Sequence, residues 1–103
     1  MNEKYINKLK EQINDECWKF GQLLGERDDI FVEVEFLFEV IKEGPFSFNF
    51  YYDEEEWGEE LYSSYFRIWE LAIDLYEYAD SEEHQEIVDG IIATAINDYI
   101  ALI

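Results

Sequence analysis

With 103 residues, 49% apolar content and a formal net charge of −19, the chain is long enough for one hydrophobic core but not for two. Its eight Phe, eight Tyr and three Trp exclude an intrinsically disordered acidic chain, because such chains lack the apolar surface that folding buries. The charge also argues against direct binding of nucleic acid or of an anionic lipid surface, because it repels both.

The sequence favours a reduced, cytosolic setting. Cys17 is the only cysteine, so no internal disulfide can form. No stretch approaches the roughly 18 uninterrupted apolar residues of a membrane helix. The first residues also lack the apolar run of a signal peptide. We therefore expect a cytoplasmic protein that forms a single domain over residues 1–103 and does not associate with membranes.

The negative charge is distributed unevenly along the chain. Residues 1–42 contain ten acids and six bases, whereas residues 43–103 contain sixteen acids and one base. Such an asymmetry indicates a partner of opposite charge rather than a general need for solubility. We therefore expect the acidic part to bind a protein with a basic surface.

Residues 3–24 have the period of an amphipathic helix. The apolar residues that recur every three or four positions are Ile6, Leu9, Ile13, Cys17, Phe20 and Leu24. Trp18 and Leu23 are expected to widen this buried stripe. Gly25 follows directly and suits the left-handed cap that ends many helices. The polar face mixes lysines with acids, so this segment is predicted to be a scaffold helix.

Residues 30–41 alternate in the way expected of a half-buried β-strand. The apolar residues at even positions are Ile30, Val32, Val34, Phe36, Phe38 and Val40. Glutamates stand at the odd positions 33, 35 and 39. A short helix between Asp28/Asp29 and Gly44 is the alternative. It ranks second because it would place Glu33 and Glu35 on opposite sides.

Residues 42–45 contain the only proline, Pro45, and are predicted to form a turn. Residues 46–52 then alternate again, with aromatic side chains at Phe46, Phe48, Phe50 and Tyr52. The two strands would form a hairpin, which has to pack against helices because an isolated hairpin is marginally stable. The predicted fold class is therefore α+β, in the order helix, β-hairpin, helix, helix.

Residues 53–80 are predicted to form the central helix. Its apolar stripe consists of Trp57, Leu61, Tyr65, Ile68, Ala72, Leu75 and Ala79. Its opposite face consists of Glu56, Glu59, Glu60, Ser63, Arg67, Glu70, Asp74 and Glu77. Gly58 interrupts the pattern, so the helix begins either within the acidic run that starts at Asp53 or near Glu59.

The acidic face of this helix is predicted to be a recognition surface. Residues three or four apart on a helix lie roughly 5–6 Å apart at Cβ, and like charges at that spacing lower helix stability. A helix selected only for stability would alternate the sign of its charges, yet Arg67 is the single base here. The residues predicted to bind a partner are Asp53, Glu54, Glu55, Glu56, Glu59, Glu60, Glu70, Asp74 and Glu77. Tyr62 and Tyr76, with Tyr51 and Tyr78, are expected to add contacts at the rim.

The last segment is predicted to be a helix that begins after an N-cap at Asp80-Ser81. One apolar stripe contains Ile87, Val88, Ile91, Ala95, Tyr99 and Leu102, and a second contains Ile92, Ile96, Ile100 and Ile103. A helix with two apolar stripes is covered on two sides. It lies either in the middle of the core or against a second copy of the chain, so a homodimer remains open.

Catalysis and dedicated metal binding have little support in the sequence. His84 is the only histidine and lies in a run of acids and glutamine, where a solvated first helical turn is expected. Cys17 lies on the inner stripe of its helix and is expected to be a buried apolar side chain. The acidic run lacks the ligand spacing of a calcium loop, and one histidine cannot supply a di-iron site. We expect no enzyme activity, no cofactor and no metal.

A row of carboxylates held on a packed helix can imitate the phosphates of a duplex and occupy a basic cleft. In size, acidity and lack of catalytic groups, the chain resembles the small DNA-mimic proteins with which phages block CRISPR or restriction nucleases. This resemblance implies an inhibitor of a nuclease's nucleic-acid-binding surface. The chain also resembles acidic immunity proteins that neutralise a partner toxin nuclease, which is the first alternative. An adaptor or assembly subunit that uses the apolar final helix is the second, and a face kept acidic for solubility is the third.

Overall fold

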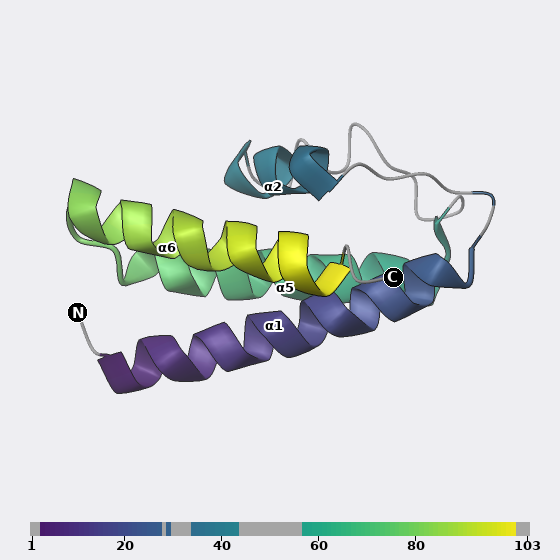
Figure 1. Ribbon diagram of the computed structural model, residues 1–103, viewed down its shortest axis with the longest axis horizontal. Helices are drawn as coiled ribbons and strands as arrows, with labels where there is room; N and C mark the ends of the chain where they lie inside the picture. The colour runs from purple at the N-terminus through teal and green to yellow at the C-terminus, as the bar shows by residue number, and fades with distance from the viewer. Residues whose placement is uncertain (1–2, 28, 30–33, 44–56, 101–103) are drawn as a thin grey trace.

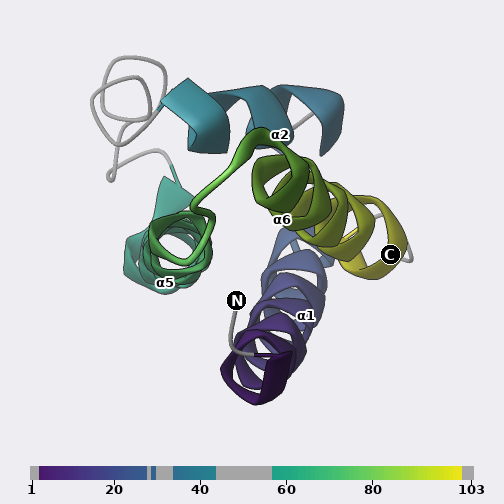
Figure 2. The ribbon, with the colours of Figure 1, turned by 90° about the vertical axis from the view of Figure 1, so that its left-hand side faces the viewer.

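The computed structural model describes residues 3–27, 29, 34–43 and 57–100. The elements are α1 (Glu3–Gly25), α2 (Val34–Glu43), α5 (Glu59–Glu77), α6 (Glu82–Ala95) and the short π-helix η1 (Ile96–Ile100), which continues α6. Helices α1, α5 and α6 run antiparallel to one another in turn and form a three-helix bundle (Figure 1). Helix α2 lies across one side of this bundle, beside α6 (Figure 2). The start of α1 and the α5–α6 turn lie at the same end of the molecule (Figure 1).

The core is built from the apolar stripes that the sequence predicts on α1 and α5. Phe20 of α1 packs against Trp57 and Tyr65, with ring centroids 5.7 Å apart in both pairs. Trp57 and Tyr65 meet edge to face at 5.6 Å. All three side chains are buried, and the Tyr65 hydroxyl donates to the backbone oxygen of Leu37 in α2 at 3.4 Å. This aromatic cluster joins α1, α2 and the start of α5.

The predicted fold class is wrong for the part of the chain that the structure describes. Residues 34–43 form helix α2 instead of a strand, and no strand occurs among the described residues, so the fold there is a helical bundle rather than α+β. Two odd positions explain the difference, because Leu37 and Ile41 are apolar and buried together with Val40. That is the i, i+3, i+4 spacing of a helix, and it leaves Glu35 and Glu39 on one exposed side.

The structure also bears on the alternative helix over residues 30–41 and on the predicted hairpin. The short helix that was the alternative for residues 30–41 is the one that forms, over Val34–Glu43. The predicted second strand, residues 46–52, lies outside the described residues. The predicted hairpin is therefore wrong, because residues 34–43 of its first strand form helix α2.

Helix α5 begins at Glu59 because Gly58 has a backbone that other residues rarely adopt. Its φ is 85° and its ψ is 159°, a region open almost only to glycine. The Gly58 carbonyl accepts from the Tyr62 backbone N–H at 3.1 Å and so closes the first turn. Of the two predicted starts, the later one is confirmed, and Trp57 precedes the helix while remaining buried.

One of the two apolar stripes of the final helix is buried within one copy of the chain. Ile92, Ile96 and Ile100 are all buried, and α6 with η1 packs against α1 and α2. The wider π turn keeps these residues, four apart, on one line facing the core. The structure therefore places this stripe in the core. Of the other predicted stripe, Ile87 is exposed and Ile91 and Tyr99 are half-buried, so a second copy of the chain against that side stays a prediction.

Candidate functional site

The candidate site is the outer face of α5, which we define by Glu59, Ser63, Phe66, Glu70, Ile73, Asp74 and Glu77. It lies opposite the buried stripe of the same helix, where Leu61, Ile68 and Leu75 are almost completely buried. The carboxylates of Glu59, Glu70 and Glu77 are exposed, and that of Asp74 is half-buried. The prediction that this stretch buries one face and presents acids on the other is confirmed from Glu59 onward.

Few bases neutralise this face. Arg67 lies 3.5 Å from the Glu70 carboxylate, in an exposed pair between residues three apart. Of the acids on the outer face, only Glu70 forms an ion pair with a base in the described part of the chain. An exposed pair of this kind contributes about 0–1 kcal/mol. The outer face therefore keeps nearly all of its negative charge.

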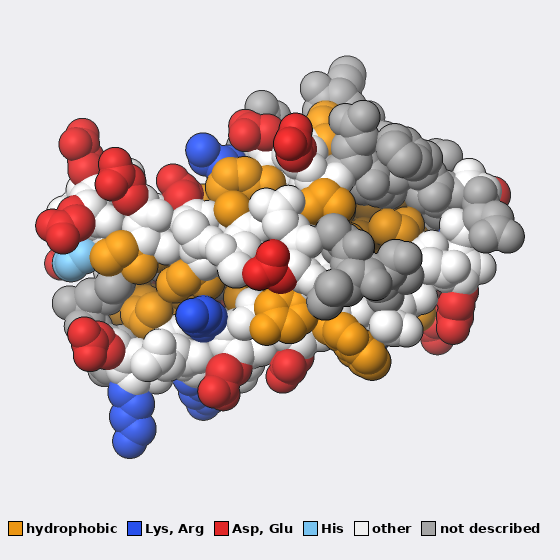
Figure 3. All heavy atoms as spheres, viewed as in Figure 1, with side chains coloured by type: hydrophobic (Ala, Val, Ile, Leu, Met, Phe, Trp, Pro, Cys, Tyr) orange, Lys and Arg blue, Asp and Glu red, His pale blue; other side chains and the backbone are white. Residues whose placement is uncertain are grey.

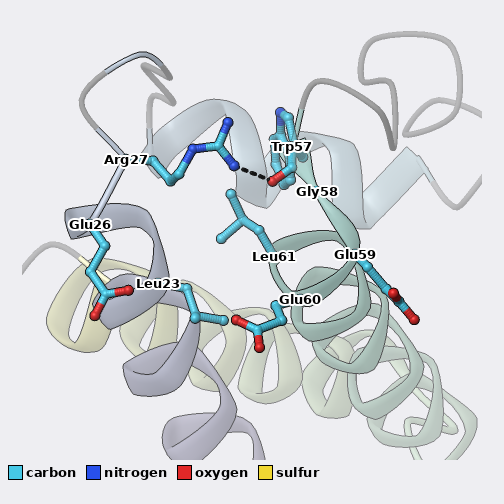
Figure 4. Close-up of a pocket in the computed structure, with 8 residues that line it drawn as sticks. All are labelled: Leu23, Glu26, Arg27, Trp57, Gly58, Glu59, Glu60 and Leu61. Atoms are coloured by element: carbon cyan, nitrogen blue, oxygen red, sulfur yellow. Dashed lines mark hydrogen bonds between the residues drawn. The ribbon is translucent and has the colours of Figure 1, made fainter.

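Glu60 points in another direction from Glu59. Glu59, Glu60 and Ser63 all line a hollow between α1 and α5 together with Lys19 and Leu23, with a volume of about 550 Å³. Figure 4 shows the Glu60 side chain turned toward Leu23 and the Glu59 side chain turned away from it. Glu60 is thus exposed at the seam between the two helices, and Glu59 and Ser63 border the same hollow from the outer face.

Arg27 closes one end of this seam. Its Nη1 donates to the Trp57 backbone oxygen at 2.6 Å, as the dashed line in Figure 4 shows. Its Nε and Nη2 donate to the two carboxylate oxygens of Asp29, each at 3.0 Å. These hydrogen bonds hold the pKa of Asp29 below its ordinary value. The guanidinium therefore fastens the end of α1 to the residue that precedes α5.

The two predicted rim tyrosines both contact the rest of the bundle. The Tyr76 hydroxyl donates to Asp89 of α6 at 2.6 Å, and burial together with this carboxylate raises the pKa of Tyr76. Tyr62 is half-buried against the core. Of the four tyrosines considered, Tyr78 is exposed, and its ring stacks on Tyr5 of α1 at 4.7 Å. Tyr51 lies outside the described residues.

The acidic run from Asp53 to Glu56, which was predicted to lead the binding surface, lies outside the described residues. The structure instead reveals an acidic end that the sequence analysis did not include in the site. Four exposed acids surround the α5–α6 turn, namely Asp80, Glu82, Glu83 and Glu86. Figure 3 shows acidic side chains gathered around the single histidine at this end of the molecule. Their density in residues 80–86 was visible in the sequence, where Asp80-Ser81 was interpreted as an N-cap and the acids around His84 as a solvated first helical turn.

The capping prediction itself is confirmed. The Ser81 hydroxyl accepts from the His84 backbone N–H at 3.2 Å. The His84 Nδ1 lies against the Asp80 carboxylate one turn away, and this contact lowers the pKa of Asp80. The single histidine is thus engaged in the surface structure of the turn.

The two side chains considered for catalysis lie in unrelated places. Cys17 is buried in the core, and loss of solvent, followed by the nearby Glu16 charge, raises the pKa of its thiol to about 12. A thiol with such a pKa stays protonated near neutral pH and is a poor nucleophile. Among the described residues, no three His, Cys, Asp or Glu side chains converge in a way that could hold a metal ion.

Within the described ranges, no helix has the length and apolarity needed to cross a membrane. Comparisons with protein-family models, with curated proteins and with solved structures found no match.

Proposed function

We propose that this protein is a non-enzymatic inhibitor that binds the basic, nucleic-acid-binding surface of a nuclease. The observation that carries the proposal is the set of exposed, largely unpaired carboxylates on the outer face of α5 and at the adjoining α5–α6 turn. A packed helix holds the α5 acids in fixed relative positions, so their charge is presented without further ordering. The single buried thiol of Cys17 supports a reducing, cytoplasmic setting for this interaction.

The density of charge indicates which end of the surface contributes most. From Glu59 to Glu77, α5 spans about 27 Å, over which a DNA duplex carries about 16 phosphates. The outer face presents four carboxylates over that length, so α5 alone imitates a duplex sparsely. The segment from Glu70 to Glu86 contains seven acids, both end residues included, and no Lys or Arg. The main contact is therefore expected around the α5–α6 turn.

Electrostatic steering gives such a surface its advantage over a neutral one. Opposite charges raise the association rate about 10- to 1,000-fold at low salt, and this gain falls as ionic strength rises. An inhibitor that competes with DNA needs fast association, because DNA is attracted to the same basic surface. Both the inhibitor of a defence nuclease and the immunity protein for a toxin nuclease would benefit in this way.

The test is inhibition of DNA cleavage by purified nucleases of the RNA-guided, restriction and toxin types. The variant Glu70→Gln/Asp74→Asn/Glu77→Gln removes three charges from the outer face. The control variant Glu3→Gln/Glu11→Gln/Asp15→Asn removes three exposed charges from α1 and has the same net charge.

We expect the first variant to lose at least tenfold in inhibition and the control to keep most of it, with the wild-type effect weakening as salt rises. Equal inhibition by both variants would show that net charge alone acts, without a defined face. If the wild-type protein inhibits none of the three types of nuclease, the proposal is overturned, and solubility becomes the better explanation of the acidic face. The class of nuclease that responds distinguishes the defence inhibitor from the immunity protein.

A further inference from the structure

An aromatic side chain lies within the outer face of α5, among its carboxylates. Phe66 is 38% exposed and is the most exposed large apolar residue on this helix before its C-cap. Its ring lies 5.5 Å from that of Trp69, centroid to centroid, at an angle of 43°. The buried stripe of α5 runs along the opposite side of the helix.

Polar groups flank Phe66 along the helix. Glu70 follows one turn later and Ser63 precedes by one turn, so each lies on a row adjoining Phe66, with Cβ atoms roughly 5–6 Å away. Both side chains are exposed. Glu59 lies two turns before Phe66 on the same side of the helix. Phe66 is thus partly exposed next to carboxylate and hydroxyl acceptors.

Trp69 gives Phe66 a rigid support. The indole is half-buried and packs against the core cluster. Its Nε1 is buried and has no hydrogen-bond acceptor among the described residues, so it contributes apolar surface rather than a donor to this patch. Because Trp69 packs against the core, it supports the partly exposed Phe66 ring beside it.

We propose that Phe66 and Glu70 together receive an arginine side chain of the basic partner. This inference rests on the proposed function and specifies the partner's chemistry. A planar guanidinium stacks on an aromatic face while its N–H groups donate to a carboxylate beside the ring. A lysine ammonium is more strongly hydrated and cannot form the same stacked, forked contact. The loose 3.5 Å pair between Arg67 and Glu70 leaves the carboxylate able to accept a second guanidinium.

The test uses oligoarginine and oligolysine peptides of equal length and charge as probes, with dissociation constants measured by calorimetry at low ionic strength. We expect the arginine peptide to bind about fivefold more tightly than the lysine peptide. Phe66→Leu keeps an apolar side chain but removes the aromatic face, so this variant should bind both peptides equally. Phe66→Tyr keeps an aromatic ring, so this variant should retain the preference for the arginine peptide. Trp18→Ala, which removes an exposed aromatic residue from α1, is the matched control and should leave the ratio unchanged.

Each outcome has a distinct meaning. Equal binding of the two peptides by the wild-type protein, or an unchanged ratio in Phe66→Leu, would overturn the arginine site while leaving a general acidic docking face intact. Binding of neither peptide at low salt would overturn the arginine site together with the docking function. Because Phe66 is largely outside the core, circular dichroism and thermal unfolding of Phe66→Leu should match the wild type and exclude misfolding as the cause of a lost preference.

Discussion

Helices α1 and α5 both bury an apolar stripe, but the charges on their polar faces differ. Each buries a stripe of apolar residues against the other, and Phe20 of α1 meets Tyr65 of α5 in the shared core. On α1, four lysines alternate with acids, whereas α5 carries Arg67 as its single base. Burial of the apolar stripes does not require this difference between the two polar faces.

The comparison assumes that both helices depend on one aromatic core, and Phe20→Ala tests this assumption with the largest expected effect. Phe20 is fully buried between Trp57 and Tyr65, so its truncation should lower the free energy of unfolding by about 3–5 kcal/mol. Urea denaturation measures this change. Trp18→Ala removes an aromatic side chain that is 53% exposed on the same helix, and its effect should stay within about 0.5 kcal/mol. Similar losses for the two variants would contradict the described packing of α1.

The start of α5 depends on the backbone conformation of Gly58. Alanine substitutions at Gly58 and at Gly90 should therefore change the stability of the protein in opposite directions. Gly58→Ala should destabilise the protein by about 1–3 kcal/mol, because φ of 85° is strained for any side chain. Gly90→Ala lies in helix α6, where an added Cβ meets nothing within 4 Å. It should stabilise by about 0.4–1 kcal/mol by restricting the unfolded chain. Thermal unfolding of both variants measures the signs, and a stabilising Gly58→Ala would show that α5 begins elsewhere.

One Asp→Asn substitution on each helix compares the two polar faces. The expected change in the free energy of unfolding is the smallest of those predicted here. Asp74 has Glu70 and Glu77 as neighbours on its helix, so Asp74→Asn should raise the free energy of unfolding by about 0.2–0.5 kcal/mol at low salt. Asp15 of α1 lies between Glu11 and Lys19, whose effects oppose one another, and Asp15→Asn should change little.

High salt should abolish the gain from Asp74→Asn, because it screens exposed charges. Chemical denaturation at two ionic strengths provides the measurement. A destabilising Asp74→Asn would mean that the outer face is already neutralised within the chain, and the reason for assigning it a basic partner would disappear.

Several site assignments depended on which way a side chain points, which periodicity constrains only loosely. Trp18 was expected to widen the buried stripe of α1 and is instead one of the most exposed apolar residues. Glu60 was grouped with Glu59, yet it turns into the seam beside Leu23. Phe66 was not singled out at all. Residues near the edge of a helical stripe face either solvent or a neighbouring helix, and the position of that neighbour decides between them.

The failure over residues 34–43 has a different cause. A short apolar segment with Glu35 and Glu39 fits a period of two through its even positions and a helical period through Leu37, Val40 and Ile41. Local pattern cannot decide between them. Packing against η1 of the final helix favours the helical form, because it buries three apolar side chains on one side.

The sequence by itself determined the long helices α1, α5 and α6, because their apolar stripes repeat over enough turns to exclude other periods. It also determined the N-cap at Ser81 and the excess of acid in the second part of the chain, since both are local properties. The tertiary structure decided that Ile92, Ile96 and Ile100 of the final helix lie in the core, that Tyr76 donates to Asp89, and that Phe66 stays partly exposed beside carboxylates. These depend on which helix lies next to which, and that arrangement follows from how all the apolar faces can be buried together.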